Sequence, residues 1–305
     1  MTNFNLAKVI LKILPNSIKK ELSDEVYLKL RYKARLGLDL DLENPSSLNE
    51  KFQWYKLNYR EPLMTKCADK VTAREYVQEC GLGHLLNEQY GVYDTFDEIN
   101  FEELPDTFFL KCNHGSGSNI LFRKSNMSEE RKEELKTDLQ KQLKTNYFWH
   151  GREWAYKDIV PKIICEKYLK SETDTPLIDL NFFCFNGSVE LIYYNVGLAD
   201  KETGKHSKGC RAVLNSSFEY MENAYTQMEC LKKEQVFLPD NMDELKQYAE
   251  ILSKPFPHAR IDFFVIDGRA YFGEITFYSA SGFMFLKPDE IYNKLGECFK
   301  LEVQK

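Results

Sequence analysis

The chain has 305 residues and a net charge of −6, so its composition gives no general drive towards nucleic acid as a partner. Its length exceeds the size at which one hydrophobic core usually keeps growing, which predicts two or three subdomains. Its 8 cysteines include no C-x-x-C pair and no Cys/His cluster at zinc spacing. This pattern favours reduced thiols in a cytoplasmic protein over a disulfide framework or a zinc site.

The first predicted helix, residues 4–14, is basic and amphipathic and ends before Pro15. Its apolar residues recur at helical spacing, while Lys8 and Lys12 lie off that stripe. Such a helix either packs against its own domain or lies on an anionic membrane, so peripheral contact at the inner face of the membrane through residues 4–20 stays open. No apolar run approaches the roughly 20 residues of a membrane span, and the two lysines interrupt any signal-peptide pattern.

Three later helices have start or stop signals in the sequence. Ser47 and Glu50 are spaced as in a capping box. A second helical pattern begins after Asp69 and stops at Gly81, where glycine commonly ends a helix. Residues 128–146 predict a charged helix with leucines on one stripe.

Residues 104–123 predict two strands joined by a small-residue loop. The first strand ends at Lys111, the loop is Gly115-Ser-Gly-Ser118, and the second strand begins at Ile120. Glycines let a backbone approach a ligand closely, and successive N–H groups in such a loop form a nest for an anion. The loop is not a Walker A motif, because no Gly-Lys-Ser/Thr ends it. Taken alone, it is either an anion nest or an ordinary hairpin turn.

The C-terminal half is predicted to be rich in strands. Residues 162–169 form a buried strand that carries Glu166, and a hairpin turns at Asn186-Gly187. The last hairpin runs through residues 258–278 and turns at Asp267-Gly268.

In this last hairpin, Arg260 and Asp262 share one face of the first strand, and Glu274 and Thr276 share one face of the second. A two-residue turn with a regular ladder would leave Glu274 on the face opposite Asp262. A three-residue turn or a bulge would bring Arg260 and both acids together, and we expect one of these. Two acids and an arginine on an apolar hairpin need compensation, which a divalent metal with an anionic ligand supplies. An ion pair on the wet side of a sheet is the alternative.

In their order along the chain, these motifs resemble the ATP-grasp superfamily and its TupA-like branch. The resemblance extends over nearly the whole chain after residue 25. It rests on Asn44-Pro-x-x-Leu-Asn-Glu-Lys51-Phe-Gln-Trp54, Asp69-Lys70, Arg74-Glu-Tyr-Val77, Leu110-Lys-Cys-Asn-His-Gly-Ser-Gly117, Glu153-Trp154, Ile164-x-Glu166-Lys-Tyr-Leu169, Phe183-Cys-Phe-Asn-Gly187, Arg260-x-Asp262 and Phe272-Gly-Glu-x-Thr-Phe277.

The resemblance implies an α+β ATP-grasp fold, in which two α+β subdomains clasp ATP between antiparallel sheets. We expect a helical N-terminal region at residues 1–65, a subdomain with the phosphate loop at 66–166 and a subdomain with the metal site at 167–305. The implied ATP-binding residues are Lys70, Lys111, His114, Gly115, Ser116, Gly117, Ser118, Glu166, Lys167 and Leu169. The two lysines would neutralise the α- and β-phosphates, the loop N–H groups would cover the β- and γ-phosphates, and the last three residues would form the adenine hinge.

The resemblance also implies a metal site and two catalytic residues. Asp262, Glu274 and Thr276 would hold Mg²⁺, and Arg260, together with Lys111, would stabilise charge on the transferring phosphoryl group. Thr276 departs from the family pattern, because many ATP-grasp enzymes have Asn there and a hydroxyl is a weaker Mg²⁺ ligand than an amide oxygen.

Asn181 is a second departure, because a phosphate-binding lysine often lies near this position. An amide cannot neutralise a phosphate. The residues that are candidates to replace the missing charge are Lys162, Lys208 and Arg211.

ATP-grasp chemistry is usually carboxylate–amine ligation through an acyl phosphate, and TupA-like proteins are associated with cell-surface polysaccharide and teichuronopeptide synthesis. The resemblance therefore implies that this chain joins a uronic-acid or peptide carboxyl to an amine or amino acid. The alternatives are a kinase that phosphorylates a glycan, a glycosyltransferase, and an ATP-binding scaffold without turnover. Residues suited to a triphosphate, Lys111 and the pair Asp262 and Glu274 among them, argue against the glycosyltransferase.

Overall fold

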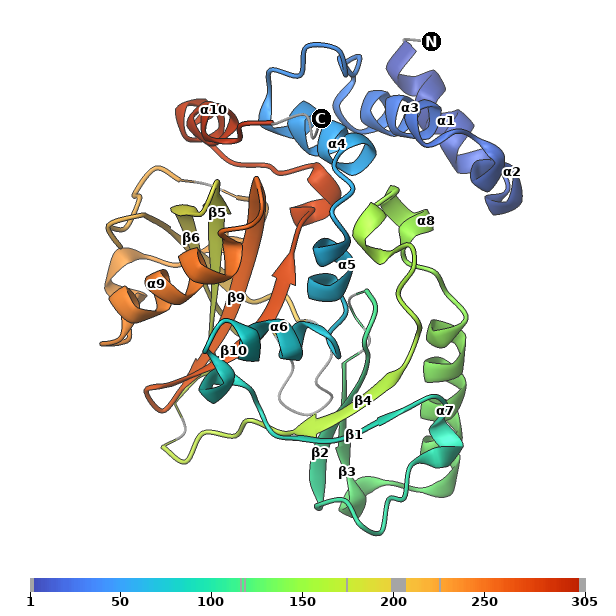
Figure 1. The fold of residues 1–305 in the computed structure, drawn as a ribbon, viewed down its shortest axis with the longest axis vertical. Coiled ribbons are helices and arrows are strands. Elements are labelled where there is room, and N and C mark those ends of the chain that lie inside the picture. Colours follow the sequence, from blue (N-terminus) through green and yellow to red (C-terminus); the bar gives the residue numbers. More distant parts are fainter. Residues whose placement is uncertain are drawn as a thin grey trace.

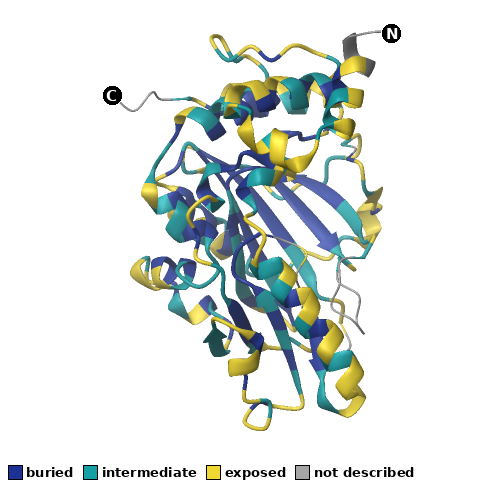
Figure 2. Ribbon diagram, turned by 90° about the vertical axis from the view of Figure 1, so that its right-hand side faces the viewer, coloured by how far each residue is buried: buried dark blue, intermediate teal, exposed yellow. Residues whose placement is uncertain are grey.

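The computed structural model describes residues 3–301 apart from 116, 118, 174, 199–206 and 225. Two β-sheets lie at its centre and helices surround them (Figure 1). Buried residues concentrate on the strands, whereas exposed residues follow the outer faces of the helices (Figure 2). The predicted α+β class is therefore confirmed.

Three helices open the described chain, α1 (Asn3–Ile13), α2 (Asn16–Glu21) and α3 (Asp24–Leu36). The Ser23 side chain caps α3, and Gly37 ends it in the left-handed conformation, with φ 76°. α1 packs against α3, yet Leu6, Val9 and Ile13 of α1 stay exposed. Within the described ranges, no helix combines the length and the apolar character that a membrane crossing needs.

Three short helices lead to the sheets, α4 (Leu48–Asn58), α5 (Pro62–Ala68) and α6 (Ala73–Glu79). The predicted capping box of α4 is present, because Ser47 and Glu50 each accept a hydrogen bond from the other's backbone N–H. Phe52 and Val77 are fully buried in a core shared with the larger sheet. α5 contacts β10, the last strand of that sheet, and this contact anchors the segment in which Lys70 lies.

The smaller sheet has the order β1-β4-β2-β3, and all its pairs are antiparallel. Its strands are β1 (Gln89–Tyr93), β2 (Thr107–Cys112), β3 (Ile120–Arg123) and β4 (Ile163–Lys167). Phe108, Leu110 and Cys112 alternate along β2 and point into a core that α7 (Glu129–Leu143) covers. Alternation turns Lys111 to the opposite face of this sheet.

The larger sheet has the order β10-β9-β5-β6-β7-β8, antiparallel except for the parallel pair β7–β8. Its strands are β5 (Ile178–Phe185), β6 (Ser188–Val196), β7 (Cys210–Asn215), β8 (Glu229–Cys230), β9 (His258–Ile266) and β10 (Arg269–Thr276). α9 (Met242–Ser253) packs on one face (Figure 1), where Cys184 Sγ approaches the Ala249 carbonyl. Since Cys184 pairs with Ala259, alternation turns Arg260 and Asp262 to the other face.

Short helices and turns complete the fold. They are α8 (Phe148–Gly151), α10 (Asp289–Cys298), and the 3₁₀ turns η1 (Gly83–Leu85), η2 (Phe96–Glu98), η3 (Lys124–Asn126), η4 (Trp154–Tyr156), η5 (Lys233–Gln235) and η6 (Ser279–Gly282). α10 packs on α4, and Lys51 Nζ donates to the carbonyl oxygens of Gly296 and Phe299, which ties α4 to the end of α10.

The β9–β10 hairpin combines a two-residue turn with a bulge. Asp267 (φ 49°) and Gly268 (φ 75°) are both left-handed, and their neighbours pair directly, so a three-residue turn is wrong. The register shifts at Gly273, which leaves Glu274 opposite Asp262. A Cβ atom at Gly273 would lie 3.0 Å from the Asp262 carbonyl oxygen, too close for an ordinary contact. The bulge, the other expected device, therefore brings both carboxylates to one face.

Candidate functional site

The polar residues of the last hairpin continue across the larger sheet as rows of neighbours. Glu274 on β10 lies opposite Asp262 on β9, and Asp262 lies opposite Asn181 on β5. In the next row of the same face, Thr276 lies opposite Arg260. Because side chains repeat with period two, all five share the face that α9 does not cover.

Arg260 joins four of these residues into one network, called here the Arg260 network (Arg260, Asp262, Glu274 and Thr276). Its Nε donates to Asp262 Oδ1 at 2.7 Å, and its Nη2 donates to Asp262 Oδ2 at 2.5 Å and to Glu274 Oε1 at 3.1 Å. Thr276 Oγ1 accepts from the same Nη2 at 3.2 Å and donates to Glu274 Oε1 at 2.9 Å. The bidentate bond to Asp262 is the strongest arrangement that a guanidinium makes with a carboxylate.

Burial and neighbouring charges set the protonation of this network. Burial raises the pKa of Asp262 to about 8, although Arg260 opposes the shift. Burial also disfavours the ionised form of Glu274, but Lys70 and Arg260 outweigh it and lower the pKa to about 2. Burial disfavours the charged form of Arg260 too, yet Asp262 and Glu274 raise its pKa. An additional cation beside Asp262 would keep this carboxylate ionised at neutral pH.

Lys70 connects the Arg260 network to the glycine loop. Its Nζ lies 3.5 Å from Glu274 Oε2 and donates to the Gly115 carbonyl oxygen at 2.7 Å. Its backbone N–H donates to the Asn113 carbonyl oxygen at 3.1 Å, and Asn113 Nδ2 donates to Asp69 Oδ1 at 2.8 Å. Asp69 and Lys70 are therefore held directly beside the loop, although the two segments are far apart in the sequence.

The glycine loop has the backbone that its sequence predicts. Gly115 and Gly117 have φ values of 81° and 82°, which favour glycine. A Cβ atom at Gly115 would lie 2.6 Å from the Tyr147 ring, so this ring packs directly against the loop backbone. Ser116 and Ser118, two further predicted loop residues, lie outside the described residues.

His114 lies behind the loop, against the end of α7. Its Nε2 is 3.2 Å from the Gln142 carbonyl oxygen and 3.0 Å from that of Thr145, and the side chain is buried. This position suits a residue that holds the loop in place through its ring.

The predicted adenine hinge lies on the smaller sheet. Lys111 Nζ donates to Glu166 Oε1 at 2.5 Å across β2 and β4. Asn87 Nδ2 donates to the Lys167 carbonyl oxygen at 2.8 Å, which leaves this oxygen one further lone pair for a ligand. Leu169 lies two residues beyond the end of β4. Lys111 and Glu166 thus form a second group, on a different sheet from the Arg260 network.

Arg74 belongs to one of the motifs that carry the family resemblance, but it is not among the predicted site residues. In the structure its Nη2 donates to the Asn87 carbonyl oxygen at 2.8 Å. Burial lowers the pKa of Arg74, and Glu166 opposes this shift, so the guanidinium lies near the predicted hinge.

Asp179 and Asn195 extend the Arg260 network and are not among the predicted site residues. Asn181 Nδ2 donates to Asp179 Oδ1 at 2.6 Å, and Asn195 Nδ2 donates to Asn181 Oδ1 at 2.8 Å. Burial raises the pKa of Asp179 to about 6, against the positive charge of Arg260. A signal for Asp179 exists in the sequence, because Asp179-Leu-Asn181 puts two polar residues at alternate positions of an otherwise apolar strand.

Arg211 is the basic residue that the structure brings to this extension. Its Nε donates to Asn195 Oδ1 at 2.6 Å, and its guanidinium carbon lies 4.0 Å from the centroid of the Tyr193 ring. The other two residues suggested for the missing lysine lie elsewhere, since Lys162 forms an ion pair with Asp94 and Lys208 is exposed.

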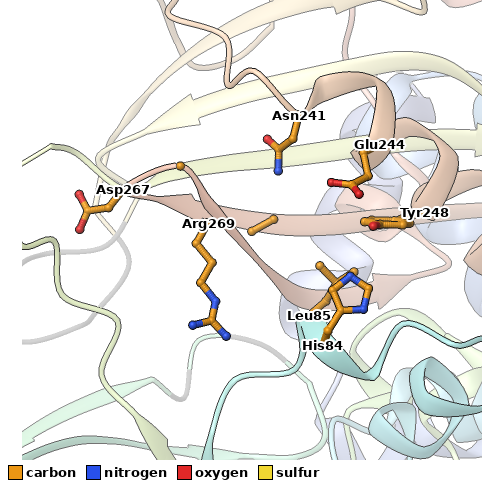
Figure 3. A pocket seen from close by; sticks show the side chains of 9 residues that line it. His84, Leu85, Asn241, Glu244, Tyr248, Asp267 and Arg269 are labelled. Carbon is orange, nitrogen blue, oxygen red and sulfur yellow. The ribbon is translucent and has the colours of Figure 1, made fainter.

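A cavity of about 420 Å³ lies at the turn of the β9–β10 hairpin, away from the Arg260 network. Figure 3 shows Asp267 and Arg269 at one end of it and His84 and Tyr248 at the other. The His84 and Tyr248 rings meet edge to face at 5.5 Å. None of the predicted site residues lines this cavity, so it is not the candidate site.

The donor atoms of the Arg260 network fit a hard divalent cation. Asp262 and Glu274 supply two carboxylates and Thr276 a hydroxyl, and Mg²⁺ is bound by such oxygens. Among the described residues, no group of three or more His, Cys, Asp and Glu side chains could hold a metal ion. A cation here would therefore complete its coordination with the hydroxyl, water or phosphate oxygens.

Comparison with known proteins assigns the chain to a class. The sequence profile of the TupA-like ATP-grasp family matches residues 50–300. The chain therefore belongs to this family. The match confirms the predicted family and the predicted ATP-grasp fold class.

Solved structures of low identity resemble the chain. An L-amino acid ligase from Bacillus licheniformis is 18% identical, with 86% of this chain and 56% of that chain covered and a TM-score of 0.43. A D-alanine–D-alanine ligase from Bacillus anthracis is 16% identical, with 69% and 56% covered and a TM-score of 0.40. The ATP-grasp ligase PsnB, complexed with a minimal precursor, is 11% identical, with 93% and 74% covered and a TM-score of 0.44. The chain spans little more than half the length of the first two, and no curated protein matches it.

Proposed function

We propose that this chain is an ATP-dependent ligase that joins a carboxylate to an amine through an acyl phosphate. The observation that carries the proposal is the contact of Lys70 with both halves of the site. One ammonium group touches the Gly115 carbonyl oxygen and lies 3.5 Å from Glu274, so the anion-binding loop and the paired carboxylates meet at one place. A triphosphate with its metal ion needs both kinds of group within a few ångströms.

In this proposal the nucleotide lies between the two sheets, clasped by subdomains at residues 66–166 and 167–305, with residues 1–65 as a helical extension. Lys70 and Lys111 neutralise the α- and β-phosphates, and the backbone N–H groups of Gly115 to Ser118 bind the β- and γ-phosphates. The hinge residues that bind the adenine are Glu166, Lys167 and Leu169. His114 supports the loop from behind.

Asp262, Glu274 and Thr276 are the residues that would hold Mg²⁺. The ion supplies positive charge to the phosphate oxygens when it is bound. In the structure Arg260 Nη2 donates hydrogen bonds to an oxygen of each carboxylate and to the hydroxyl oxygen of Thr276. Arg260 must therefore give up some of these bonds, and the freed guanidinium is then available to a phosphoryl group.

The reaction has two steps that balance in atoms and charge. A substrate carboxylate oxygen attacks the γ-phosphorus, the bond to the β-phosphate oxygen breaks, and ADP leaves. An amine nitrogen then attacks the acyl carbon, phosphate leaves, and the nitrogen loses a proton to form the amide.

The substrates we propose are the uronic-acid or peptide carboxyl of a bacterial capsular or cell-surface polysaccharide precursor and an amine or amino acid. This choice is supported by the resemblance to TupA-like proteins. The polar row from Arg211 to Asp179 adds a second positive group beside the Arg260 network, which suits an anionic acceptor.

The test of the reaction measures ADP release with uronic acids, peptides and amines supplied separately and together. A ligase releases ADP in a carboxylate-dependent manner. Hydroxylamine, in place of the amine, should trap the acyl phosphate as a hydroxamate. A glycan phosphate ester that accumulates without hydroxamate would refute the ligase and establish the kinase instead, and no turnover with any of these would leave an ATP-binding scaffold.

We also propose that residues 4–20 contact the inner face of the membrane from the cytoplasmic side. Leu6, Val9, Ile13 and Ile18 are exposed apolar side chains on α1 and α2, and basic residues flank them. Cosedimentation with anionic vesicles should fall when Val9 and Ile13 are both replaced by Ser. Unchanged sedimentation of that variant would exclude the contact.

A further inference from the structure

A second concentration of positive charge lies away from the Arg260 network. α2, α3, the end of α7 and α8 enclose a cavity of about 330 Å³. Among the described residues that line it, none is acidic, and four carry a positive charge at neutral pH. These four are Lys19, Lys20, Lys144 and Arg152. Figure 1 shows this region between α2 and α8, on the far side of α8 from α5.

Arg152 is the deeply buried member of the four, with 1% of its surface exposed. Its Nη2 donates to the carbonyl oxygens of Lys19 at 2.6 Å and Leu22 at 3.2 Å. Its guanidinium carbon lies 4.4 Å from the centroid of the Trp149 ring. Nη1 is buried and has no hydrogen-bond partner in the described part of the chain. Asp24 Oδ1 lies 3.3 Å from Nε, an ion-pair distance without the geometry of a hydrogen bond.

A buried guanidinium donor that lacks an acceptor is uncommon, because desolvation of a charged group is costly unless an acceptor compensates it. The backbone conformation of Arg152 is a second energetic cost, since the residue is left-handed, with φ 55°. The cavity is therefore lined by an arginine with a donor that has no acceptor among the described residues.

The three lysines leave the charge of the cavity uncompensated. Lys19, Lys20 and Lys144 form no ion pair among the described residues, whereas Lys29 and Lys33 on neighbouring α3 pair with carboxylates at 2.6 Å and 2.8 Å. Lys20 Nζ instead lies 5.5 Å from the centroid of the Trp149 ring. Like charges gathered around a concave surface attract an anion to it.

We propose that this cavity binds the phosphate group of a phosphorylated ligand. The Arg152 guanidinium lines the cavity and supplies positive charge for one phosphate oxygen, and the lysine ammonium groups neutralise the remaining charge. A phosphate carries close to two negative charges at neutral pH, which matches four cations better than the single charge of a carboxylate does. The aromatic walls formed by Tyr27 and Trp149 leave room for an organic part.

The ligand has two possible sources with the same phosphate chemistry. One is a soluble sugar phosphate, and the other is the headgroup of an anionic lipid. Ile13 and Ile18 are exposed and lie close in sequence to the lining residues Asn16 and Lys19, which makes a lipid surface physically reasonable, so the experiment includes an arm for each source.

The first arm measures binding of inorganic pyrophosphate and inorganic phosphate by calorimetry. The full-length protein is first saturated with a non-hydrolysable ATP analogue and Mg²⁺, so that the glycine loop is not available to the probe. We expect saturable binding at a single site, accompanied by a change in tryptophan fluorescence that disappears in Trp149→Phe. Absence of binding by both anions at millimolar concentration, together with absence of binding to the vesicles below, would overturn the proposal.

Exposed lysines allow variants that keep the fold. Lys20→Ala and Lys144→Ala should each weaken binding by about 3- to 10-fold, a range typical of one lost charge-assisted contact. Lys141→Ala, in the last turn of the helix that Lys144 caps but outside the cavity, is the matched control and should bind normally. Equal losses in Lys141→Ala and Lys144→Ala would show attraction by diffuse surface charge and would refute the cavity.

The second arm measures cosedimentation with vesicles of phosphatidylcholine alone or with added phosphatidylglycerol or phosphatidic acid. Binding to the anionic vesicles that falls in Lys20→Ala and Lys144→Ala, but not in Lys141→Ala, would assign the cavity to a lipid headgroup. Binding of the soluble anions with the same pattern, and none to vesicles, would assign it to a soluble phosphate. Vesicle binding that ignores the cavity lysines, without binding of soluble anions, would refute the proposal.

Discussion

Buried Arg152 and partly buried Arg260 have their charges compensated in opposite ways. Arg260 is surrounded by acceptors, with two bonds to Asp262 and one each to Glu274 and Thr276. Arg152 is surrounded by rings and backbone carbonyls, and its Nη1 has no acceptor among the described residues. The first arginine therefore has two carboxylates as hydrogen-bond acceptors, whereas the second has only the carboxylate of Asp24, which lies 3.3 Å from Nε without the geometry of a hydrogen bond.

This difference indicates what each site can accept. At Arg260, Asp262 and Glu274 together with nearby Asp179 provide charge for a cation, and Arg260 is the group that a cation would partly displace. At Arg152 an incoming anion meets a donor that is already in place. A charge that is removed from water without a partner costs free energy. Removal of one charge from either site should therefore have a large effect on binding or stability.

The largest expected effect comes from Asp262→Asn, which removes one of the two carboxylates of the proposed metal site. We expect turnover to fall by roughly 10³-fold or more while the fold persists, because the lost charge stabilises the bound metal and its phosphates. Steady-state ADP release and circular dichroism would measure the two properties. Glu274→Gln should behave in the same way, and Thr276→Val should be milder. A folded Asp262→Asn protein with near-normal turnover would contradict the metal assignment.

Arg260→Ala tests the other partner in the same network. It should slow both acyl phosphate formation and amide formation by roughly 10²- to 10³-fold, as expected for one lost donor to a developing charge. Hydroxamate formation measures the first step alone, and complete turnover measures both. Because the variant leaves Asp262 and Glu274 without a guanidinium, its Mg²⁺ affinity should rise or stay equal. A fall in Mg²⁺ affinity would show that Arg260 supports the metal site instead of competing with it.

The sequence allowed much of the Arg260 network to be predicted, for a simple reason. Arg260 and Asp262, like Glu274 and Thr276, are two residues apart, and period-two alternation places each pair on one face of a strand. The bulge at Gly273, which brings the pairs together, was expected only as one of two alternatives. Its position depends on how the ladder of two whole strands settles, which local turn signals do not determine.

Other parts of both sites could not be read from local pattern. The row that links Asp179, Asn195 and Arg211 depends on the register between β5, β6 and β7, and register is a tertiary property. Arg152 is a single charged residue in the sequence. Its environment is assembled from α2, α3 and α8, and α8 follows the other two by more than a hundred residues along the chain, so no spacing rule identifies it.

The pH dependence of Mg²⁺ binding tests the contrast between the Arg260 network, which we expect to bind a cation, and the Arg152 cavity, which we expect to bind an anion. Burial raises the pKa of Asp262 to about 8, so below this pH the free protein must lose a proton to bind the ion. We expect Mg²⁺ affinity, measured without nucleotide, to rise about tenfold per pH unit up to about pH 8 and then to level off. Glu274, with a pKa of about 2, stays ionised throughout, and Asp179, at about 6, adds to the slope only at its lower end. In Asp262→Asn the slope above pH 7 should vanish. An equal slope in both proteins would assign the titration to another group.

The smallest expected effect concerns the stability that Arg152 contributes. Arg152→Lys keeps the positive charge but loses the fork that caps the carbonyl oxygens of Lys19 and Leu22. We expect the free energy of unfolding to fall by about 1–3 kcal/mol, the usual cost of leaving buried polar groups unpaired. Arg131→Lys, at an exposed position of α7, is the matched control and should cost about 0.5 kcal/mol or less.

Thermal unfolding with and without pyrophosphate separates a structural role of Arg152 from a role in binding, because a ligand that binds only the folded state raises the stability of that state. Pyrophosphate should raise the Tm of the wild-type protein and of Arg131→Lys more than that of Arg152→Lys, with the ATP analogue present in every sample. If Arg152→Lys is destabilised but gains as much from pyrophosphate as the wild-type protein, Arg152 serves the packing of α2 and not the anion.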